Sequence, residues 1–379
     1  MKLAFVSTFD AKNVHKRSGT PFHMTQALEH AGVDFDYIHS LKTVLPLQFK
    51  LKRIWTRMTS VQRDSSRWNI AAAKNYARQV KQQLKGKNVQ GVMTHILNTT
   101  AYLDYDKPLI LWTDAIYSNL LGFVPGFSRD SAATIHHANE ITSEFLERCK
   151  LAIFSSEWGA RGAIELFGAS KDKIHVVPFG ANIANSPSFA EVQHNVKNRS
   201  RDVIKFLFLG KDWLRKGGDN VLNVVKALHA AGQRVELNIV GCHPPKSEII
   251  PDYVNCLGYV SKKTSAGNTL LKRLLSESHF LFVPSRAEAY GIVFCEASAF
   301  GLPVLTTYVG GISTIVKDNL NGMTFALEAT PKTYCDYIIG LMQNYSRYEE
   351  LALSAFHEYE TRLNWGVNVK QVKQLIQQL

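Results

Sequence analysis

The sequence predicts an α/β protein built from two doubly wound units, each a parallel sheet covered by helices. Three observations support this prediction. The chain has 379 residues, which is too many for one ordinary core. Strand-like and helical segments alternate along its whole length, which is the pattern of parallel βαβ units. A polar segment with little periodicity, residues 185–201, interrupts the alternation once, and the pattern then restarts.

The predicted domain boundaries follow from that interruption. We expect a first unit at residues 1–180 and a second unit at residues 181–362. A C-terminal helix at 363–379 is too short to form a domain, so we expect it to pack back on the first unit. Two doubly wound units joined by a linker also imply a cleft between them.

The first unit begins with an apolar, strand-like run at residues 3–7. The Ser-Gly-Thr-Pro break at 18–21 starts a helix, because Ser and Thr cap helices and Pro suits the first helical turn. The further predicted elements of this unit are helices at 22–30 and 69–84, and strands at 33–38, 91–94, 108–112, 151–154 and 174–177.

The second unit repeats the alternation. Its predicted strands are 205–209, 235–240, 279–283 and 304–306, and its predicted helices are 220–231, 270–276, a helix that begins near Gly291, and 333–345. The tail at 367–379 is amphipathic, with apolar residues near helical spacing.

Composition narrows the class of protein. The chain is 45% apolar and 20% charged, which is typical of a soluble globular protein. No run approaches the roughly 18 apolar residues of a membrane span, and the first residues lack the apolar core of a signal peptide. The five cysteines are scattered without C-x-x-C spacing, as expected for free thiols in a reducing compartment. We therefore expect a cytoplasmic protein.

Positive charge is concentrated near the N-terminus. The net charge is +12, and residues 50–87 hold 11 Lys and Arg against one acid, Asp64. Trp55 and Trp68 lie within this stretch. It could contact anionic lipid head groups, at the inner face of a membrane, or a polyanionic acceptor or nucleic acid. The alternative is a solvated helix face with a few buried aromatic residues.

Two glutamates separated by seven residues mark the second unit. Glu288 follows the apolar strand 279–283 in a Gly-containing loop, and Glu296 lies inside the helix that begins near Gly291. Strand ends and the free N–H groups of a helix start meet at one crevice, which suits phosphate. Two acceptors for sugar hydroxyls beside such a helix start predict a nucleotide-sugar site. The apolar neighbours of Glu296 argue against a solvated acid there.

Four glycine-containing segments support this site. The loop 210–218 places three cations and three glycines directly after a strand, as a phosphate clamp would. It does not have the Walker A pattern. The other segments are Val240-Gly241, Leu257-Gly-Tyr-Val260, whose backbone could lie beside a base, and Val309-Gly-Gly-Ile312.

In this order and at these intervals, the segments resemble the C-terminal half of a retaining glycosyltransferase of family 4, which has the GT-B fold. The resemblance covers nearly the whole chain. It implies that Glu288 accepts hydrogen bonds from donor-sugar hydroxyls, that Glu296 holds the ribose and that Lys216 neutralises the diphosphate. The other donor-binding residues that it implies are Gly19 from the opposite unit, Gly210, Lys211, Arg215, Gly241, Tyr259, Val260, Tyr290, Gly291, Ile292 and Val293.

Three positions depart from the family pattern. Lys211 stands where the family often has Arg, so either Lys211 or Arg215 contacts the phosphate. The ammonium group of a lysine fits a phosphate less well than the planar, forked guanidinium group of an arginine. Asp114 stands where many members have His, and it is a candidate for orienting the acceptor hydroxyl or supporting the sugar face. A helix cap or a turn acid is the alternative for Asp114. Ser313-Thr314 replaces a common acid, which could change donor specificity.

The resemblance implies a retaining transfer without a compulsory protein nucleophile, with Glu288, Asp114 and Lys216 as catalytic residues. Lys216, with Lys211 or Arg215 and helix N-termini, would stabilise the leaving diphosphate. The acceptor would attack from the same face of the sugar. No D-x-D metal motif occurs near these segments, so we expect neither a metal nor a cofactor.

Four functions stay open from the sequence. The first is sugar transfer to a lipid-linked or cell-envelope glycan. The second is the same chemistry on DNA or another polyanion, with DNA less favoured than lipid as a partner. The third is a non-catalytic sugar-nucleotide sensor or partner subunit, against which the intact glutamate pair argues. The fourth is a nucleotide-sugar epimerase of the same fold.

Overall fold

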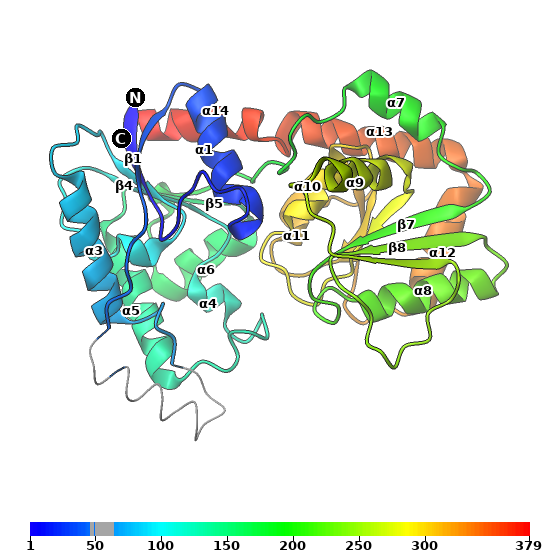
Figure 1. The fold of residues 1–379 in the computed structure, drawn as a ribbon, viewed down its shortest axis with the longest axis horizontal. Coiled ribbons are helices and arrows are strands. Elements are labelled where there is room, and N and C mark those ends of the chain that lie inside the picture. The colour runs from blue at the N-terminus through cyan, green and yellow to red at the C-terminus, as the bar shows by residue number, and fades with distance from the viewer. Residues whose placement is uncertain (46–48, 50–63) are drawn as a thin grey trace. The chain divides into compact units, whose positions relative to one another are not determined.

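The computed structural model describes residues 1–45, 49 and 64–379, which divide into two compact units (Figure 1). Unit 1 is Met1–Phe179 together with Trp365–Leu379, and unit 2 is Gly180–Asn364. The chain therefore passes between the units after residue 179 and after residue 364. The polar segment 185–201 lies inside unit 2.

Unit 1 is built on six parallel strands in the order β2-β1-β3-β4-β5-β6. They are β1 Lys2–Val6, β2 Asp34–Ile38, β3 Val92–Thr94, β4 Leu109–Thr113, β5 Leu151–Phe154 and β6 Ile174–Val176. The central strand β4 is buried along its full length, as expected for an apolar run with both sheet faces covered. Strand order reverses between β1 and β3, so their carboxyl ends form the switch point of this sheet.

Among the described residues, the helices of unit 1 are α1 Thr20–His30, α3 Ile70–Leu84, α4 Tyr117–Leu120, α5 Ala132–Arg148, α6 Glu157–Phe167 and α14 Trp365–Gln377. Asn69 caps α3, because its side chain accepts the Ala72 N–H at 3.2 Å. Of the basic stretch 50–87, residues 50–63 lie outside the described residues. Of the remaining cations, Lys74, Arg78 and Lys81 are exposed on α3, and Lys85 is exposed directly after it.

Helix α14 packs against α1 within unit 1. The Trp365 ring stacks on Phe179 with centroids 5.6 Å apart and meets Trp112 edge-on at 5.5 Å. The Lys373 ammonium donates to the Ala31 carbonyl at 2.6 Å, just after α1, where helix carbonyls lack intrahelical partners. Unit 1 therefore covers the apolar face that the sequence gives this tail.

Unit 2 is built on six parallel strands in the order β12-β11-β10-β7-β8-β9. They are β7 Ile204–Leu209, β8 Val235–Val240, β9 Val254–Gly258, β10 Phe280–Phe282, β11 Val304–Thr307 and β12 Gly322–Phe325. This is the Rossmann strand order, and it reverses between β7 and β10. The sequence analysis missed β9 and β12, the two edge strands, because short edge strands with polar residues and glycine carry a weak strand pattern.

The helices of unit 2 are α7 Phe189–Lys197, α8 Gly218–Ala230, α9 Ser265–Glu277, α10 Ile292–Ser298, α11 Ile312–Ile315, α12 Pro331–Gln343 and α13 Tyr345–Arg362. Neither unit, over the residues that are described, contains a helix with the length and apolar character needed to cross a bilayer.

Helix α7 stands where the sequence predicted a linker, so that prediction is wrong. Ser188 and Glu191 cap the helix reciprocally. Val192 on its inner face is fully buried in a cluster with Ala352 and Phe356 of α13. Ser and Asn suit both loops and helix caps, and only the packing partner on α13 distinguishes the two.

Candidate functional site

Two loops of unit 2 flank the point where its strand order reverses. One follows β7 and contains residues 210–217, and the other follows β10 and contains residues 283–291. Because β7 and β10 are hydrogen-bonded neighbours, both loops leave the same edge of the sheet. Open α/β sheets bind ligands at such an edge.

The two loops touch through a glycine. Gly217 has φ of +72° and precedes α8. A Cβ atom at this position would collide with the carbonyl oxygen of Pro284 in the other loop. Arg286 N–H donates to the Arg215 carbonyl at 2.7 Å and completes the backbone contact between the loops. The pair Gly210 and Gly241 lies beside them, directly after β7 and β8.

The Glu288 carboxylate contacts two cations of the first loop. The Lys216 ammonium donates to Glu288 Oε2, and one Arg215 Nη lies 3.7 Å from the same oxygen. Arg215 also donates to the Ala287 carbonyl at 2.9 Å. The Lys216 side chain is 10% exposed and the Glu288 side chain 14% exposed, so the ions interact in a medium less screened than water. The two cations and the carboxylate form one cluster.

A second ion pair joins the loops on their outer side. The Arg286 guanidinium binds both carboxylate oxygens of Asp219, in the first turn of α8, at 2.7 Å each. It also donates to the Leu214 carbonyl at 2.5 Å. The bidentate bond lowers the pKa of Asp219 and raises the pKa of Arg286. Sequence analysis did not identify this pair, which holds the Lys216 and Glu288 loops together.

Glu296 lies in α10 and is almost buried, with 6% of its side chain exposed. The Lys262 ammonium, from the loop between β9 and α9, donates to Glu296 Oε1 at 2.5 Å. Gly291 precedes α10 with φ of +94°, and a Cβ atom there would lie 2.5 Å from the Phe294 ring. The half-buried Ile292 and Val293 begin the helix, where backbone N–H groups lack intrahelical partners.

Tyr290 and Tyr259, both predicted to bind the donor, occupy different environments. Tyr290 is buried, and its hydroxyl lies 3.6 Å from the Cys295 sulfur, so its side chain faces the core. Tyr259 is exposed and lies beside the half-buried Val260, after β9. The Lys211 ammonium lies 5.7 Å from the Tyr259 ring centroid. Lys211 therefore faces Tyr259, whereas Arg215 faces Glu288.

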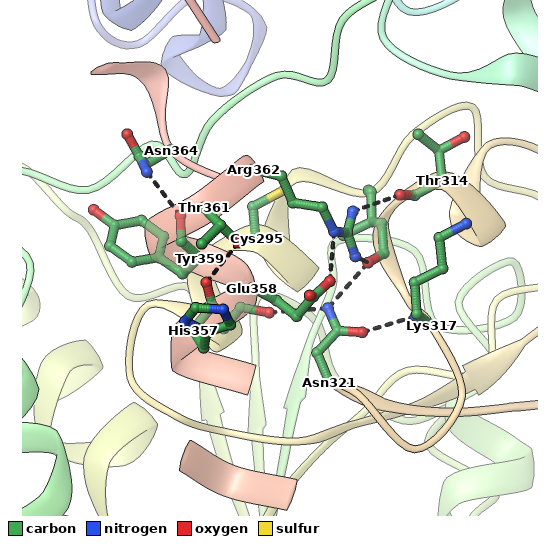
Figure 2. Close-up of polar contacts among 12 residues, drawn as sticks. Cys295, Thr314, Lys317, Asn321, His357, Glu358, Tyr359, Thr361, Arg362 and Asn364 are labelled. Atoms are coloured by element: carbon green, nitrogen blue, oxygen red, sulfur yellow. Dashed lines mark hydrogen bonds and ion pairs between the residues drawn. The ribbon is translucent and has the colours of Figure 1, made fainter. Parts of the chain in front are cut away.

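Helix α11 connects the Glu288 loop to the end of α13. The Gly311 N–H donates to the Glu288 carbonyl at 3.2 Å. At the other end of α11, Arg362 donates to the carbonyls of Thr314 and Ile315 at 2.7 and 2.6 Å (Figure 2). The guanidinium thus satisfies helix-terminal carbonyls that lack intrahelical partners. It fixes α11 and, through Gly311, supports the backbone at Glu288.

Two predicted residues belong to unit 1. Gly19 precedes α1 with φ of +83°, after Arg17 and Ser18, which also have positive φ. Asp114 directly follows β4, and its Oδ1 accepts the Ala115 N–H at 3.0 Å. This bond is typical of a turn acid, and Asp114 Oδ2 takes no part in it, so both the turn role and the functional role remain predictions for Asp114.

His95 and Ser7 form a pair at the switch point of unit 1 that the sequence analysis missed. They follow β3 and β1, and Ser7 Oγ lies 3.2 Å from His95 Nε2. The imidazole stacks on Phe5 with centroids 5.8 Å apart. Burial, together with the charges of Arg17 and Arg67, holds the pKa of His95 well below its ordinary value. The available signal was a polar residue directly after a buried strand.

The structure thus brings most predicted donor-site residues to one edge of unit 2. Lys216 and Arg215 both contact Glu288, and Glu296 lies one helix turn beyond the Glu288 loop. Lys211 lies on the same loop but is directed to Tyr259. The two cations and the nearby helix start can bind a phosphate. The carboxylate beside them can accept hydrogen bonds from a hydroxyl-rich group.

Comparison with known proteins agrees with this geometry. Residues 204–344 match the family model described as glycosyl transferases group 1. A curated relative, D-inositol 3-phosphate glycosyltransferase of Xylanimonas cellulosilytica, is 29% identical over 220 residues, which cover 54% of this chain and 51% of the relative. The chain spans about half the length of the curated relatives that it matches. The matched model covers the part of unit 2 that carries both glutamates.

Solved structures match the chain from end to end. Sucrose-phosphate synthase of Thermosynechococcus elongatus superposes with a TM-score of 0.70 at 16% identity, over 100% of this chain and 98% of that chain. HepE of Anabaena in complex with UDP-glucose gives a TM-score of 0.61 at 15% identity, over 100% of both chains. This chain has the GT-B fold. Its two six-stranded parallel sheets are the two Rossmann-like units of that fold, and the predicted fold class is confirmed.

Proposed function

We propose that the protein is a retaining glycosyltransferase of family 4 that moves a sugar from a nucleotide-diphosphate sugar to a hydroxyl acceptor. The contact of Lys216 and Arg215 with Glu288 at the switch point of unit 2 is the observation that carries this proposal. The family match over residues 204–344 and the UDP-glucose bound by HepE support it.

Each group of the cluster has a role in the proposed reaction. Glu288 accepts hydrogen bonds from the sugar hydroxyls, and Glu296 accepts those of the ribose. The Lys216 ammonium has three N–H donors, so it can hold Glu288 and an oxygen of the diphosphate together. Arg215, which faces the same carboxylate, is favoured over Lys211 as the second phosphate ligand. The start of α10 adds N–H donors for the phosphate.

The proposed chemistry breaks one bond and forms another at the anomeric carbon. The bond to the diphosphate oxygen breaks, and the acceptor oxygen bonds to the same face of the sugar. The leaving phosphate oxygen takes the acceptor proton, so no protein nucleophile is needed. Lys216 and Arg215 offset the charge that develops on the diphosphate, and because the two loops already hold them there, little reorganisation is required. No metal takes part in this scheme.

The acceptor is proposed to bind unit 1 and to be a lipid-linked or cell-envelope glycan. Asp114 and His95, at the ends of β4 and β3, are the candidates for orienting its hydroxyl. The cations on the exposed side of α3 would attract an anionic membrane surface in this scheme, with the protein at its cytoplasmic face.

The direct test is incubation with a panel of UDP-, GDP- and other nucleotide sugars while free nucleotide is measured, with and without EDTA. We expect release with one donor class, unchanged by EDTA. Proton NMR of the product should show the donor's anomeric configuration. The proposal would be wrong if no donor gave free nucleotide and neither UDP nor GDP raised the melting temperature.

A second acceptor class is favoured by the same basic surface. The exposed cations of α3 and the adjacent Lys85 would also suit DNA or another polyanion. Flotation with vesicles containing anionic lipid would support the envelope acceptor. Retention of DNA with a steep salt dependence, and no flotation, would favour the polyanion instead.

A further inference from the structure

The contact between Lys262 and Glu296 joins a residue outside every sequence motif to the ribose-binding carboxylate of the proposed function. Lys262 Nζ lies 2.5 Å from Glu296 Oε1. The two residues lie on different elements, the loop after β9 and the helix α10. Two local hydrogen bonds flank Lys262 in this loop: Ser261 Oγ accepts the Lys263 N–H at 3.2 Å, and Thr264 Oγ1 accepts the Gly267 N–H at the start of α9.

The two partners differ in how firmly they are held. Glu296 is carried by α10 and only 6% of its side chain is exposed, whereas 53% of the Lys262 side chain is exposed. The carboxylate is therefore fixed, and the ammonium reaches it from the solvent side. The bond from Lys262 uses Oε1 of this carboxylate, and Oε2 is its second acceptor oxygen.

The chemistry of the pair complements a hydroxyl group. A hydroxyl donates one hydrogen bond and accepts up to two, a carboxylate only accepts, and an ammonium group only donates. A ribose hydroxyl that donates to Glu296 therefore leaves its own oxygen unsatisfied unless a donor lies beside the carboxylate. Lys262 is such a donor, with N–H groups that are not used by Glu296.

We propose that Lys262 is a nucleotide-binding residue that, together with Glu296, recognises the ribose hydroxyls and selects ribonucleotides over 2′-deoxyribonucleotides. This inference rests on the proposed function, because it assigns Glu296 to the ribose. A hydrogen bond from the charged Lys262 ammonium to a ribose hydroxyl oxygen is stronger than one between two neutral groups. Removing this hydrogen bond should weaken the binding only of nucleotides that carry the 2′-hydroxyl. A general attraction of the lysine for phosphate would instead affect ribonucleotides and deoxyribonucleotides alike.

The test compares binding of UDP, GDP and their 2′-deoxy analogues by calorimetry, using the full chain. We expect wild type to bind the preferred ribonucleotide at least about 10-fold more tightly than its deoxy analogue, because a charged hydrogen bond is at stake. Lys262→Met should weaken ribonucleotide binding about 10-fold and leave the deoxy analogue nearly unchanged. Lys262→Arg, which keeps a cationic donor, should restore part of the difference.

The matched control is Lys263→Met, the exposed lysine next in the same loop, which should bind all four nucleotides as wild type does. If Lys262→Met binds ribonucleotides as tightly as wild type, or more tightly, Lys262 is not a ligand contact and this inference is overturned while the proposed function stands. If wild type binds neither UDP nor GDP and releases nucleotide from no donor of the panel, the proposed function is overturned and this inference with it.

Discussion

Units 1 and 2 are both built on six parallel strands, yet the ends of their strands carry different chemistry. At the switch point of unit 2, opposite charges meet, with Glu288 bound by Lys216 and approached by Arg215. At the switch point of unit 1, Ser7 contacts His95, whose depressed pKa keeps the imidazole neutral near pH 7. Ion pairs therefore connect the side chains at the switch point of unit 2, and a neutral hydrogen bond connects those at the switch point of unit 1.

This difference has a physical consequence for each edge. Paired charges cross-link the loops of unit 2, so the groups that would meet a diphosphate are in position before it binds. A neutral imidazole beside a hydroxyl can accept one hydrogen bond and donate another without disturbing a charge network. The comparison therefore assigns charge stabilisation to unit 2 and hydroxyl recognition to unit 1 in the proposed reaction.

The largest expected effect is that of Glu288→Gln. The change keeps the shape and one acceptor for Lys216 but removes the charge that draws both cations together. We expect kcat to fall about 10²- to 10³-fold, as when a charge-stabilising group is removed from an active site. Steady-state nucleotide release measures it, with the exposed Glu328→Gln of unit 2 as the control. Equal kcat for the two variants would show that the charged cluster is not the reacting centre.

Arg199→Met should cause the largest loss of stability. This arginine of unit 2 is 4% exposed and donates to the carbonyls of Ser276, Phe300 and Gly301 and to the Tyr348 hydroxyl. Its loss leaves several buried acceptors unpaired, so we expect unfolding free energy to fall by about 3 kcal/mol. Urea denaturation measures this. Arg201→Met, whose side chain is 66% exposed, should change it by less than about 1 kcal/mol.

Acid should destabilise unit 2 through His279. Its Nδ1 accepts the Lys205 N–H at 3.0 Å and its Nε2 donates to the Ser200 carbonyl at 2.7 Å, which is possible only for the neutral ring. Burial, aided by Arg199 and Lys205, lowers the pKa of His279 to about 3. The unfolded chain binds a proton near pH 6.5 and the folded chain does not. This contribution is therefore complete above pH 6.5 and is lost as pH falls from there towards 3.

The expected slope is about 1.4 kcal/mol of unfolding free energy per pH unit below pH 6.5. Urea denaturation at pH 7, 6 and 5 measures it, and His279→Gln should have a slope smaller by about this amount. If the variant and wild type lose stability in parallel, another group controls the acid sensitivity.

His95→Gln tests the assignment of unit 1. Glutamine retains a polar group near Ser7 but does not reproduce the positions of the two ring nitrogens that would orient the acceptor hydroxyl. We expect kcat/KM for the acceptor to fall about 10-fold with little change in unfolding free energy, in contrast to the structural His279. Acceptor-dependent transfer measures it, with the exposed His136→Gln as the control. Unchanged transfer by the His95 variant would remove the functional contrast between the two switch points.

The smallest expected effect belongs to the outer ion pair of unit 2. Arg286→Lys loses the fork that binds both oxygens of Asp219. Both side chains are at least one third exposed, so a double-mutant cycle with Asp219→Asn should give a coupling of only about 0.2–1 kcal/mol. A coupling near zero would leave the backbone contacts as the main link between the two loops.

The sequence by itself determined the parts of this protein that depend on local spacing. All six strands of unit 1 and the central strands of unit 2 follow from alternation of apolar runs with helices, because burial on both faces of a parallel sheet requires such runs. The donor-site candidates followed from a second local signal. Glu288 and Lys216 stand in loops that follow strands, and the carboxyl ends of parallel strands share one edge.

Only the tertiary structure decided which side chains meet across that edge. Lys216 and Glu288 are 72 positions apart, and Lys262 and Glu296 are 34 positions apart. No local period relates such residues, because their distance is set by the crossover helices between the strands. The same reason explains why the polar segment around α7 was predicted as a linker. Spacing determines elements and strand ends, whereas pairing depends on how the elements are packed.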